Sequence, residues 1–364
     1  MGESCVSVFE IMEKLKEKNQ KPKISVVVTT LNEAETIVEL LESLAGQTLS
    51  PIEVVVVDGG SVDKTAWRVQ EFIKKDRDSG SLHFGGQAGS GMTKTRIFSK
   101  NGNRSVGRNY GVEKASGDLI AFTDAGCRPD LAWLKELELA MQRSRNKSGM
   151  TTKHIVVAGY YYGLPATPFE EAVVPYSLVM PERVNPKTFL PSTRSMLISK
   201  KLFLELGGFD EKLSDNEDFA LARKIKSQKS KVKIILAKKA RVGWYPRKNL
   251  REFVMMIYRF ARGDARARIL RPKVSLIYLR YLFLIIFSCL YLASQCKMQN
   301  AQCQNWNLII WYLLGIWILL FGIYSLWSIR KNYRYVKNGW YYLPVLQIAS
   351  DLAVMIGTIR GLLF

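Results

Sequence analysis

Few residues in this sequence can build a metal centre from sulfur and nitrogen. Its 364 residues include five cysteines, which form no CxxC pair, and only two histidines. A zinc site usually needs four such ligands at short spacings, so the sequence argues against one. Cys296 and Cys303 share one short loop, and they can form a disulfide only if that loop faces an oxidising compartment.

Acidic residues are also scarce. The chain has 32 aspartates and glutamates against 53 lysines and arginines, a formal net charge of +21. Such a balance indicates nucleic acid, an anionic membrane surface or a phosphorylated substrate as a partner. The positive charge concentrates beside apolar segments in the last third of the chain. We therefore expect membrane lipids and phosphate groups as partners, and no nucleic acid.

A secretory signal is missing from the start of the sequence. Residues 1–22 have the spacing of a short amphipathic helix that ends in basic residues, and they contain no long apolar core. We predict an N-terminal helix over residues 1–22. The domain that follows it then stays on the side of the membrane where synthesis occurs.

Three long apolar runs occupy residues 276–294, 306–328 and 341–363. At about 1.5 Å per residue, each is long enough to cross a hydrocarbon core of about 30 Å. We predict a transmembrane region of about three helices over residues 275–364. The third run is the least regular, because it contains Pro344 and Asp351, and a charge at depth usually faces other helices.

Basic residues flank these runs unequally. Residues 241–274 and the segment between the second and third runs are rich in Lys and Arg, whereas Lys297 is the one charge between the first and second runs. The positive-inside rule places the basic segments in the cytoplasm. We therefore expect a multi-pass protein of the cell membrane, with its N-terminal domain cytoplasmic and its C-terminal end outside.

The first part of the chain alternates strand and helix patterns. Residues 24–30 are a β-branched run typical of a buried strand, and a helix pattern ending near Gly46 follows. Residues 53–57 and 64–75 repeat the alternation, and residues 119–123 form a further buried strand. This order predicts an α/β fold with a mainly parallel sheet. We predict a loop or small hairpin for the glycine-rich residues 79–103.

Five motifs, read in order, make residues 23–273 resemble glycosyltransferase family 2. The motifs are VVVTTLNEAETI, VVVVDGGSVDKT, SVGRNYGVEKASGDLIAFTDAG, GGFDEKLSDNEDFALARKIK and LREFVMMIYRFARGDARAR. The resemblance implies a GT-A fold in a catalytic domain over residues 23–240, followed by a basic amphipathic interfacial segment over residues 241–274. It also implies a nucleotide-diphosphate sugar (a UDP-sugar or GDP-sugar), inversion at the anomeric carbon, and usually a divalent metal, Mg²⁺ or Mn²⁺.

The donor residues follow from the same resemblance. Polar residues at the carboxyl ends of parallel strands lie in one crevice. Asp58 can accept a hydrogen bond from a nucleobase, although it can equally cap the turn that follows. Arg108 presents a guanidinium fork that suits phosphate. The expected donor-binding residues are Thr30, Asn32, Glu33, Asp58, Arg108 and Asn109.

The expected metal ligand is Asp124, which matches the first acid of the family's Asp-x-Asp motif. A hard cation that bridges diphosphate oxygens needs oxygen ligands. This sequence departs from the motif, because Gly126 stands where the second acid is expected. Asp130 follows four residues later. The metal site is therefore either completed by substrate phosphates and water or weakened.

The expected catalytic residues are Asp218 and its neighbour Glu217. Asp218 matches the family's base, which accepts the proton of the acceptor hydroxyl. Consecutive residues of a helix point about 100° apart, so one acid can face the site while the other supports it. The alternative is that both acids only stabilise the start of a helix.

The acceptor side is expected at Ser192, Arg194, Arg259 and Arg262. The first pair resembles a segment that lines the acceptor in relatives, or is simply a turn before a strand. The second pair lies in a basic amphipathic pattern where the family has Q-x-x-R-W, of which neither Gln nor Trp is kept. This pattern is equally typical of plain membrane adhesion.

We therefore expect an inverting glycosyltransferase with a lipid-linked acceptor, in particular a polyprenyl-linked one, on the cytoplasmic face. The alternatives are a polysaccharide synthase with export and a degenerate, non-catalytic protein that binds nucleotide sugars.

Overall fold

The computed structural model describes residues 22–78, 93–148, 151, 154–228, 231–269, 271–297 and 306–363. The predicted helix over residues 1–22 lies almost wholly outside these ranges, and so does the pairing of Cys296 with Cys303. The chain forms two compact units, residues 1–163 with 181–245 and residues 164–180 with 246–364.

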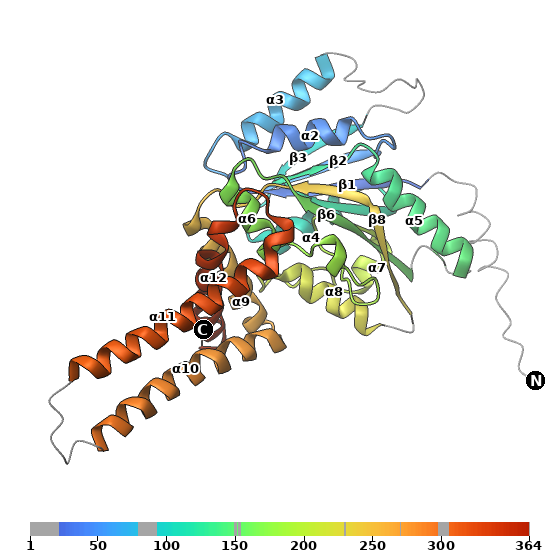
Figure 1. Cartoon of the computed structure of the whole chain (residues 1–364). Coiled ribbons are helices and arrows are strands. Elements are labelled where there is room, and N and C mark those ends of the chain that lie inside the picture. The colour runs from blue at the N-terminus through green and yellow to red at the C-terminus, as the bar shows by residue number, and fades with distance from the viewer. Residues whose placement is uncertain are drawn as a thin grey trace, which may run out of the picture. The chain divides into compact units, whose positions relative to one another are not determined.

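The first unit contains a mixed sheet. Its described strands are β1 (Ile24–Thr30), β2 (Glu53–Asp58), β3 (Lys94–Ser99), β4 (Leu119–Asp124), β5 (Cys127–Pro129), β6 (Ile155–Gly163), β7 (Met196–Ser199) and β8 (Lys233–Trp244). Their order across the sheet is β3-β2-β1-β4-β7-β6-β8-β5 (Figure 1). The β3-β2-β1-β4 half is parallel, whereas β7 runs antiparallel to both β4 and β6. The β6–β8 pair is parallel, and the β8–β5 pair is antiparallel.

Helices of the first unit connect and cover these strands. They are α2 (Ile37–Ala45), α3 (Thr65–Asp78), α4 (Arg104–Lys114), α5 (Trp133–Ser148), α7 (Lys200–Glu205) and α8 (Glu217–Ser227), with a 3₁₀ turn over Pro181–Arg183. The alternation of β1, α2, β2 and α3 confirms the predicted α/β fold. Runs of Val occupy the middle of β1 and β2, which are almost wholly buried, as central parallel strands require.

The strand β3 lies where the sequence predicts a loop or small hairpin. Residues 94–99 instead form a parallel strand beside β2. It lies at the edge of the sheet and its residues are at most half-buried. An edge strand can carry Lys94 and Arg96 at little cost, and these charges hide its pattern in the sequence.

Close packing brings α4 to the carboxyl ends of β1 and β2. A Cβ built on Gly111 would lie 2.6 Å from Val27 Cγ1, and one on Gly107 would lie 3.0 Å from Thr29 Cγ2. Only glycine permits this approach without displacing the strand. A core around Phe122, which contacts Phe203 and Phe209 at ring-centroid distances of 5.6 Å each, joins α4, α7 and α8 to the same face of the sheet.

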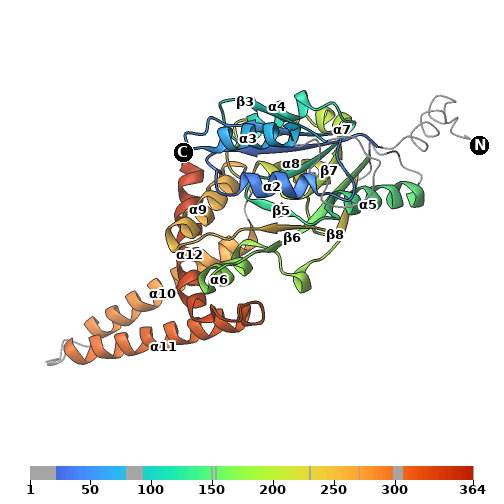
Figure 2. The same cartoon turned by 90° about the horizontal axis from the view of Figure 1, so that it is seen from above.

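The second unit is helical. It contains α6 (Pro168–Ser177), α9 (Leu250–Arg266), α10 (Pro272–Lys297), α11 (Trp306–Asn332) and α12 (Leu343–Leu363), with 3₁₀ turns over Tyr333–Tyr335 and Trp340–Tyr342. In Figure 2, α10 and α11 extend as two long arms, whereas α12 lies with α9. In the part of the chain that the structure describes, three helices are long and apolar enough to cross a membrane, over Pro272–Tyr291, Leu314–Tyr335 and Trp340–Leu363.

Candidate active site

A buried guanidinium joins two acidic side chains at the carboxyl edge of the sheet. Asn103 caps α4 by accepting from the Val106 N–H at 3.1 Å, which sets the helix so that Arg108 lies in its second turn. Arg108 Nη2 lies 2.8 Å from Asp124 Oδ1 at the end of β4, and Nη1 contacts Glu217 at the start of α8. The side chains of Arg108 and Glu217 are only 4% and 5% exposed, so their ion pair is shielded from water, whereas the Asp124 side chain is 31% exposed.

The electrostatics of this cluster differ between the two acids. Burial alone raises the pKa of the Asp124 carboxyl, but Arg108, Arg194 and Arg104 together hold it below its usual range. Burial raises the pKa of Glu217, and Arg108 opposes this only in part. Asp124 is therefore a firmly ionised carboxylate in a positively charged environment.

Asp218 follows Glu217 but points to different partners. Both begin α8 after Asn216, which has a left-handed backbone with φ of 59°. The Ser192 hydroxyl donates to Asp218 Oδ2 at 2.8 Å, and the Phe219 N–H donates to Oδ1 at 2.7 Å. Asp218 is half-buried, whereas Glu217 is buried. Of the two acids, Asp218 is thus the one that is both oriented and accessible.

Arg194 completes the positive side of the site. Its guanidinium carbon lies 5.3 Å from the ring centroid of Tyr161 and 5.4 Å from that of Trp244, a cation–π arrangement that holds the planar group. Burial lowers the pKa of Arg194, but the negative groups around it, including Asp124 and Asp218, raise this pKa overall. The segments containing residues 124, 194 and 218 therefore form one cluster.

The predicted donor residues Asn32 and Asp58 lie in two linked turns. Asp58 accepts hydrogen bonds from the N–H groups of Gly60 at 3.2 Å and Ser61 at 3.0 Å. The Asn32 N–H donates to Ser61 Oγ, and Asn32 Oδ1 accepts from the Val62 N–H, each at 2.9 Å. Asp58 therefore caps its turn, which is the alternative that the sequence left open.

Thr30 and Glu33 flank the same turns. Thr30 is 4% exposed, and within the described ranges its Oγ1 has no hydrogen-bond partner. Such an orphaned hydroxyl at a strand end is what a ligand group can satisfy. The Glu33 N–H donates to Thr65 Oγ1 at 2.8 Å, which fixes the turn that carries the Glu33 carboxylate.

Asn109, also predicted as a donor-binding residue, makes hydrogen bonds to a neighbouring loop. Its Nδ2 donates to Phe209 O at 2.9 Å and to Glu211 Oε1 at 3.0 Å, and its Oδ1 accepts from the Phe209 N–H at 2.9 Å. The amide is thus committed to the loop that leads from α7 toward α8. This arrangement explains Asn109 as an anchor for that loop.

The acids near Gly126 are the candidates for ligands of a divalent cation. A Cβ built on Gly126 would lie 3.9 Å from Glu33 Oε2, so a carboxylate from another turn lies beside the position where the second acid is missing. Asp124 uses Oδ1 for Arg108 and remains 31% exposed. Carboxylate oxygens are ligands that a hard cation prefers, and diphosphate and water can supply the others. Within the described ranges, no group of three or more Asp, Glu, His or Cys residues is arranged to hold a metal ion.

Asp130 does not belong to this group. It accepts from the Tyr162 hydroxyl at 2.7 Å and from Arg241 Nε at 2.9 Å. The remaining predicted residues, Arg259 and Arg262, lie on α9 in the second unit.

Three further residues of the cluster were missed in the sequence analysis: Arg104, Tyr161 and Trp244. Arg104 acts on Asp124, and the two rings hold Arg194. The sequence offers one signal for Arg104, which directly follows the helix cap Asn103 and lies one helical turn before Arg108. Nothing local marks Tyr161 and Trp244, which come from paired strands.

Clustered arginines beside an oriented carboxylate are what a protein needs to bind a phosphorylated ligand and to accept a proton next to it. Residues 25–204 match the family model described as Glycosyl transferase family 2. The chain contains a glycosyltransferase family 2 domain.

Known proteins agree with this assignment. Over 125 residues the chain is 34% identical to glycosyltransferase AglE of Haloferax volcanii, an alignment that covers 31% of this chain and 34% of AglE. Over 103 residues it is 31% identical to the uncharacterized glycosyltransferase EpsJ of Bacillus subtilis, covering 28% of this chain and 26% of EpsJ. The chain thus matches about a third or less of these relatives' length.

A solved structure shares the fold. It is the mannosyltransferase PcManGT from Pyrobaculum calidifontis in complex with GDP-Man and Mn²⁺, at a TM-score of 0.54 and 17% identity, covering 93% of this chain and 88% of that one. This likeness confirms the GT-A type of mixed α/β fold.

Proposed function

We propose that this chain is an inverting glycosyltransferase that moves a sugar from a nucleotide-diphosphate donor to a lipid-linked acceptor at the cytoplasmic face of the cell membrane. The observation that carries the proposal is Asp218, an accessible carboxylate held by Ser192 beside a buried arginine cluster. In this proposal Asp218 accepts a proton, and the neighbouring arginines attract phosphate.

The reaction that this geometry supports is a direct displacement. Asp218 accepts the proton of the acceptor hydroxyl as the oxygen attacks the anomeric carbon, and the nucleoside diphosphate leaves from the opposite face. A positioned base contributes about 10²- to 10⁴-fold to such a step. Arg194 is the cation best placed to attract the donor diphosphate or an acceptor phosphate, because aromatic rings hold its guanidinium in place.

Glu217 and Arg108 have a supporting role in this proposal. Arg108 forms ion pairs with Asp124 and Glu217, so it orders the two acids and is a positioning residue. Asp124 with Glu33 would hold Mg²⁺ or Mn²⁺, which when bound supplies positive charge to the leaving diphosphate. The PcManGT complex contains GDP-Man and Mn²⁺, which favours this cofactor class and a nucleotide-diphosphate sugar as the donor.

The acceptor proposal rests on the apolar helices. A chain with candidate spans and a positively charged segment beside them suits an acceptor held in the bilayer, such as a polyprenyl phosphate or a polyprenyl-linked saccharide. Arg259 and Arg262 on α9 are the proposed contacts for its phosphate.

The test is a transfer assay with the purified full-length protein in detergent. UDP- and GDP-sugars are screened with Mn²⁺, Mg²⁺ or EDTA, with and without a membrane lipid extract. Transfer of one sugar into the lipid fraction, dependent on metal and lipid, is the expected result. Long products would favour a polysaccharide synthase. Donor binding without turnover in any combination would favour a non-catalytic binding protein.

A further inference from the structure

The last helix, α12, packs closely along α9. A Cβ built on Gly357 would lie 2.5 Å from Tyr258 O, and one on Gly361 would lie 2.5 Å from Arg262 O. The contacts advance together in both helices, so the two run side by side in the same direction. Glycines four residues apart permit such a close approach of two helix backbones.

The helix α9 is too charged to lie in hydrocarbon. On an insertion scale each such charge at the centre of a membrane helix costs about 2.5–3.5 kcal/mol. Its apolar face is buried, with Phe253, Met256 and Ile257 on it. The charged residues of α9 are Arg251, Glu252, Arg259, Arg262, Asp264 and Arg266. Because α12 lies alongside α9, a bilayer crossing by α12 would carry these charges into the membrane.

Burial separates α12 from the other two candidate spans. In the apolar stretches of α10, α11 and α12, the buried shares are 0%, 6% and 39%. The exposed apolar side chains of α12 include Leu352, Ile356, Ile359 and Leu363, which lie along one side, whereas Gly357 lies on the buried side. One apolar and one covered side is typical of a helix at the boundary of headgroups and acyl chains.

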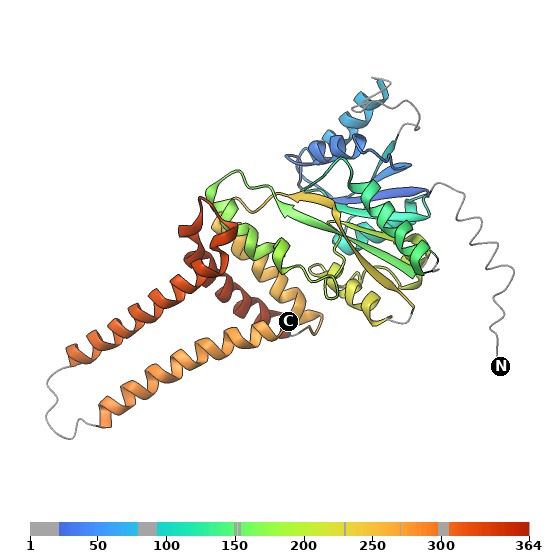
Figure 3. The same cartoon turned by 45° about the vertical axis from the view of Figure 1, so that its right-hand side comes forward.

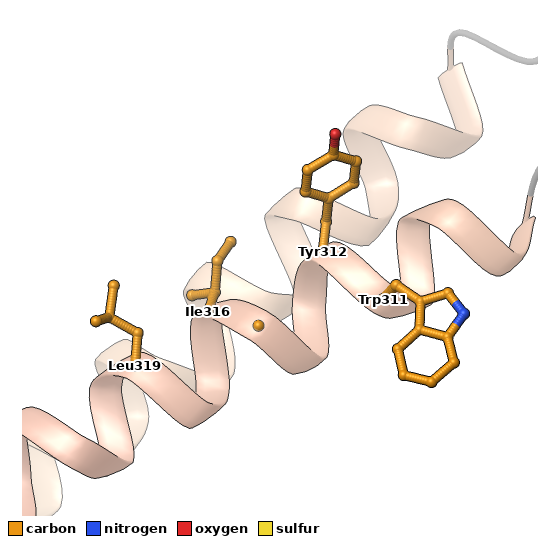
Figure 4. A pocket seen from close by; sticks show the side chains of 5 residues that line it. Trp311, Tyr312, Ile316 and Leu319 are labelled. Atoms are coloured by element: carbon orange, nitrogen blue, oxygen red, sulfur yellow. The ribbon is translucent and has the colours of Figure 1, made fainter.

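By contrast, α11 is apolar on nearly all sides. A shallow apolar recess at Gly315 is lined by Trp311, Tyr312, Ile316 and Leu319, all from this one helix (Figure 4). An acyl chain suits such a recess better than a sugar does, because it offers almost no polar group. The lining therefore supports α11 as a helix surrounded by lipid.

A polar layer marks where the hydrocarbon ends. Buried Asp351 of α12 accepts from Arg280 of α10 at 2.8 Å and also contacts the Tyr324 hydroxyl of α11. The Arg280 guanidinium lies 4.6 Å from the Tyr324 ring centroid and 6.0 Å from that of Trp327. From the start of α11 to Trp327 is about 32 Å, close to the thickness of the hydrocarbon core, and Tyr and Trp favour its boundary.

We infer that, among the helices in the described ranges, α10 and α11 alone cross the bilayer and that α12 lies with α9 at the membrane surface. Figure 3 shows α10 and α11 as the two long arms of the second unit, with α12 at their base. The proposed partner of the exposed apolar side of α12 is the bilayer, because the same unit carries two exposed apolar helices that are long enough to cross it. Two crossings return the end of α12 to the side that carries α9.

The test is protease protection in sealed membrane vesicles of known orientation, using the full-length chain with an epitope tag after its last residue. An antibody against the first unit shows on which side of the membrane residues 181–245, which precede α9, are digested. A matched control inserts an apolar span of about 20 residues before the tag, which must move the tag to the opposite side.

The expected result is that protease removes the tag and the first unit from the same face, and that the inserted span reverses the tag alone. Protection of the tag on the face where the first unit is digested would overturn the inference. This readout needs no enzymatic activity, so it stands or falls separately from the proposed function.

Discussion

Replacement of Arg108 by methionine tests the buried bridge at the centre of the site. Methionine keeps much of the volume but leaves Asp124 and Glu217 without their shared cation. Removing one partner of a buried ion pair typically costs about 3–5 kcal/mol. At about 2–4 °C per kcal/mol for a unit of this size, the midpoint of thermal unfolding should fall by about 6–20 °C.

The loss should also depend on pH. Burial raises the pKa of Glu217, and without Arg108 the opposing attraction is gone. Folded Arg108→Met protein then keeps a proton that the unfolded chain releases above about pH 4.3. Its stability therefore falls as the pH rises from that value toward the raised folded-state pKa. The deficit relative to wild type should be smaller at pH 5 than at pH 8.

The assay is thermal unfolding of the full-length protein in detergent at both pH values, followed by tryptophan fluorescence. Arg143→Met, an exposed substitution on α5, is the matched control and should leave the midpoint within about 2 °C of wild type. A midpoint in Arg108→Met as high as in this control, or a loss equal at both pH values, would refute the account of the bridge.

Three other substitutions test separate parts of the molecule. Ser192→Ala should lower kcat about fivefold with donor affinity unchanged, because Asp218 loses a hydrogen bond worth about 1 kcal/mol; an equal kcat would count against the orientation of Asp218 by Ser192. Glu53→Gln should lower the unfolding midpoint at pH 7, because hydrogen bonds and an ion pair outweigh burial and lower the pKa of Glu53. Below about pH 4 the difference in midpoint between wild type and variant should shrink. A difference that persists in acid would contradict this. Gly357→Ala should lower the midpoint and Gly322→Ala should not, since a Cβ at position 322 meets no atom within 4 Å; equal midpoints would argue against the close packing of α12.

Sequence patterns predict the parallel half of the sheet better than the rest. The strands β1 and β2 contain runs of buried Val, and α2 buries the apolar positions that its spacing indicates. The antiparallel strand β7 has four residues and pairs with strands far away in the chain. No local sequence pattern indicates such a distant partner, so the β7-β6-β8-β5 half of the sheet is not predicted.

The site shows the same division. Glu217 and Asp218 are adjacent, and the helical geometry predicts that they diverge, as they do. Their partners cannot be predicted locally, because Arg108 is 109 residues from Glu217 and Ser192 is 26 residues from Asp218. The sheet topology brings these groups together. For Asp58 the sequence left nucleobase binding and turn capping open, and the structure adds the turn contacts.

Asp218→Asn is the most direct test of the proposed function. Donor binding by calorimetry and sugar transfer to lipid extract are measured for this variant and for wild type in the same detergent. The account predicts donor affinity within about twofold of wild type and transfer slower by about 10²- to 10⁴-fold, because the amide cannot accept the hydroxyl proton. Transfer by Asp218→Asn at the wild-type rate would contradict it.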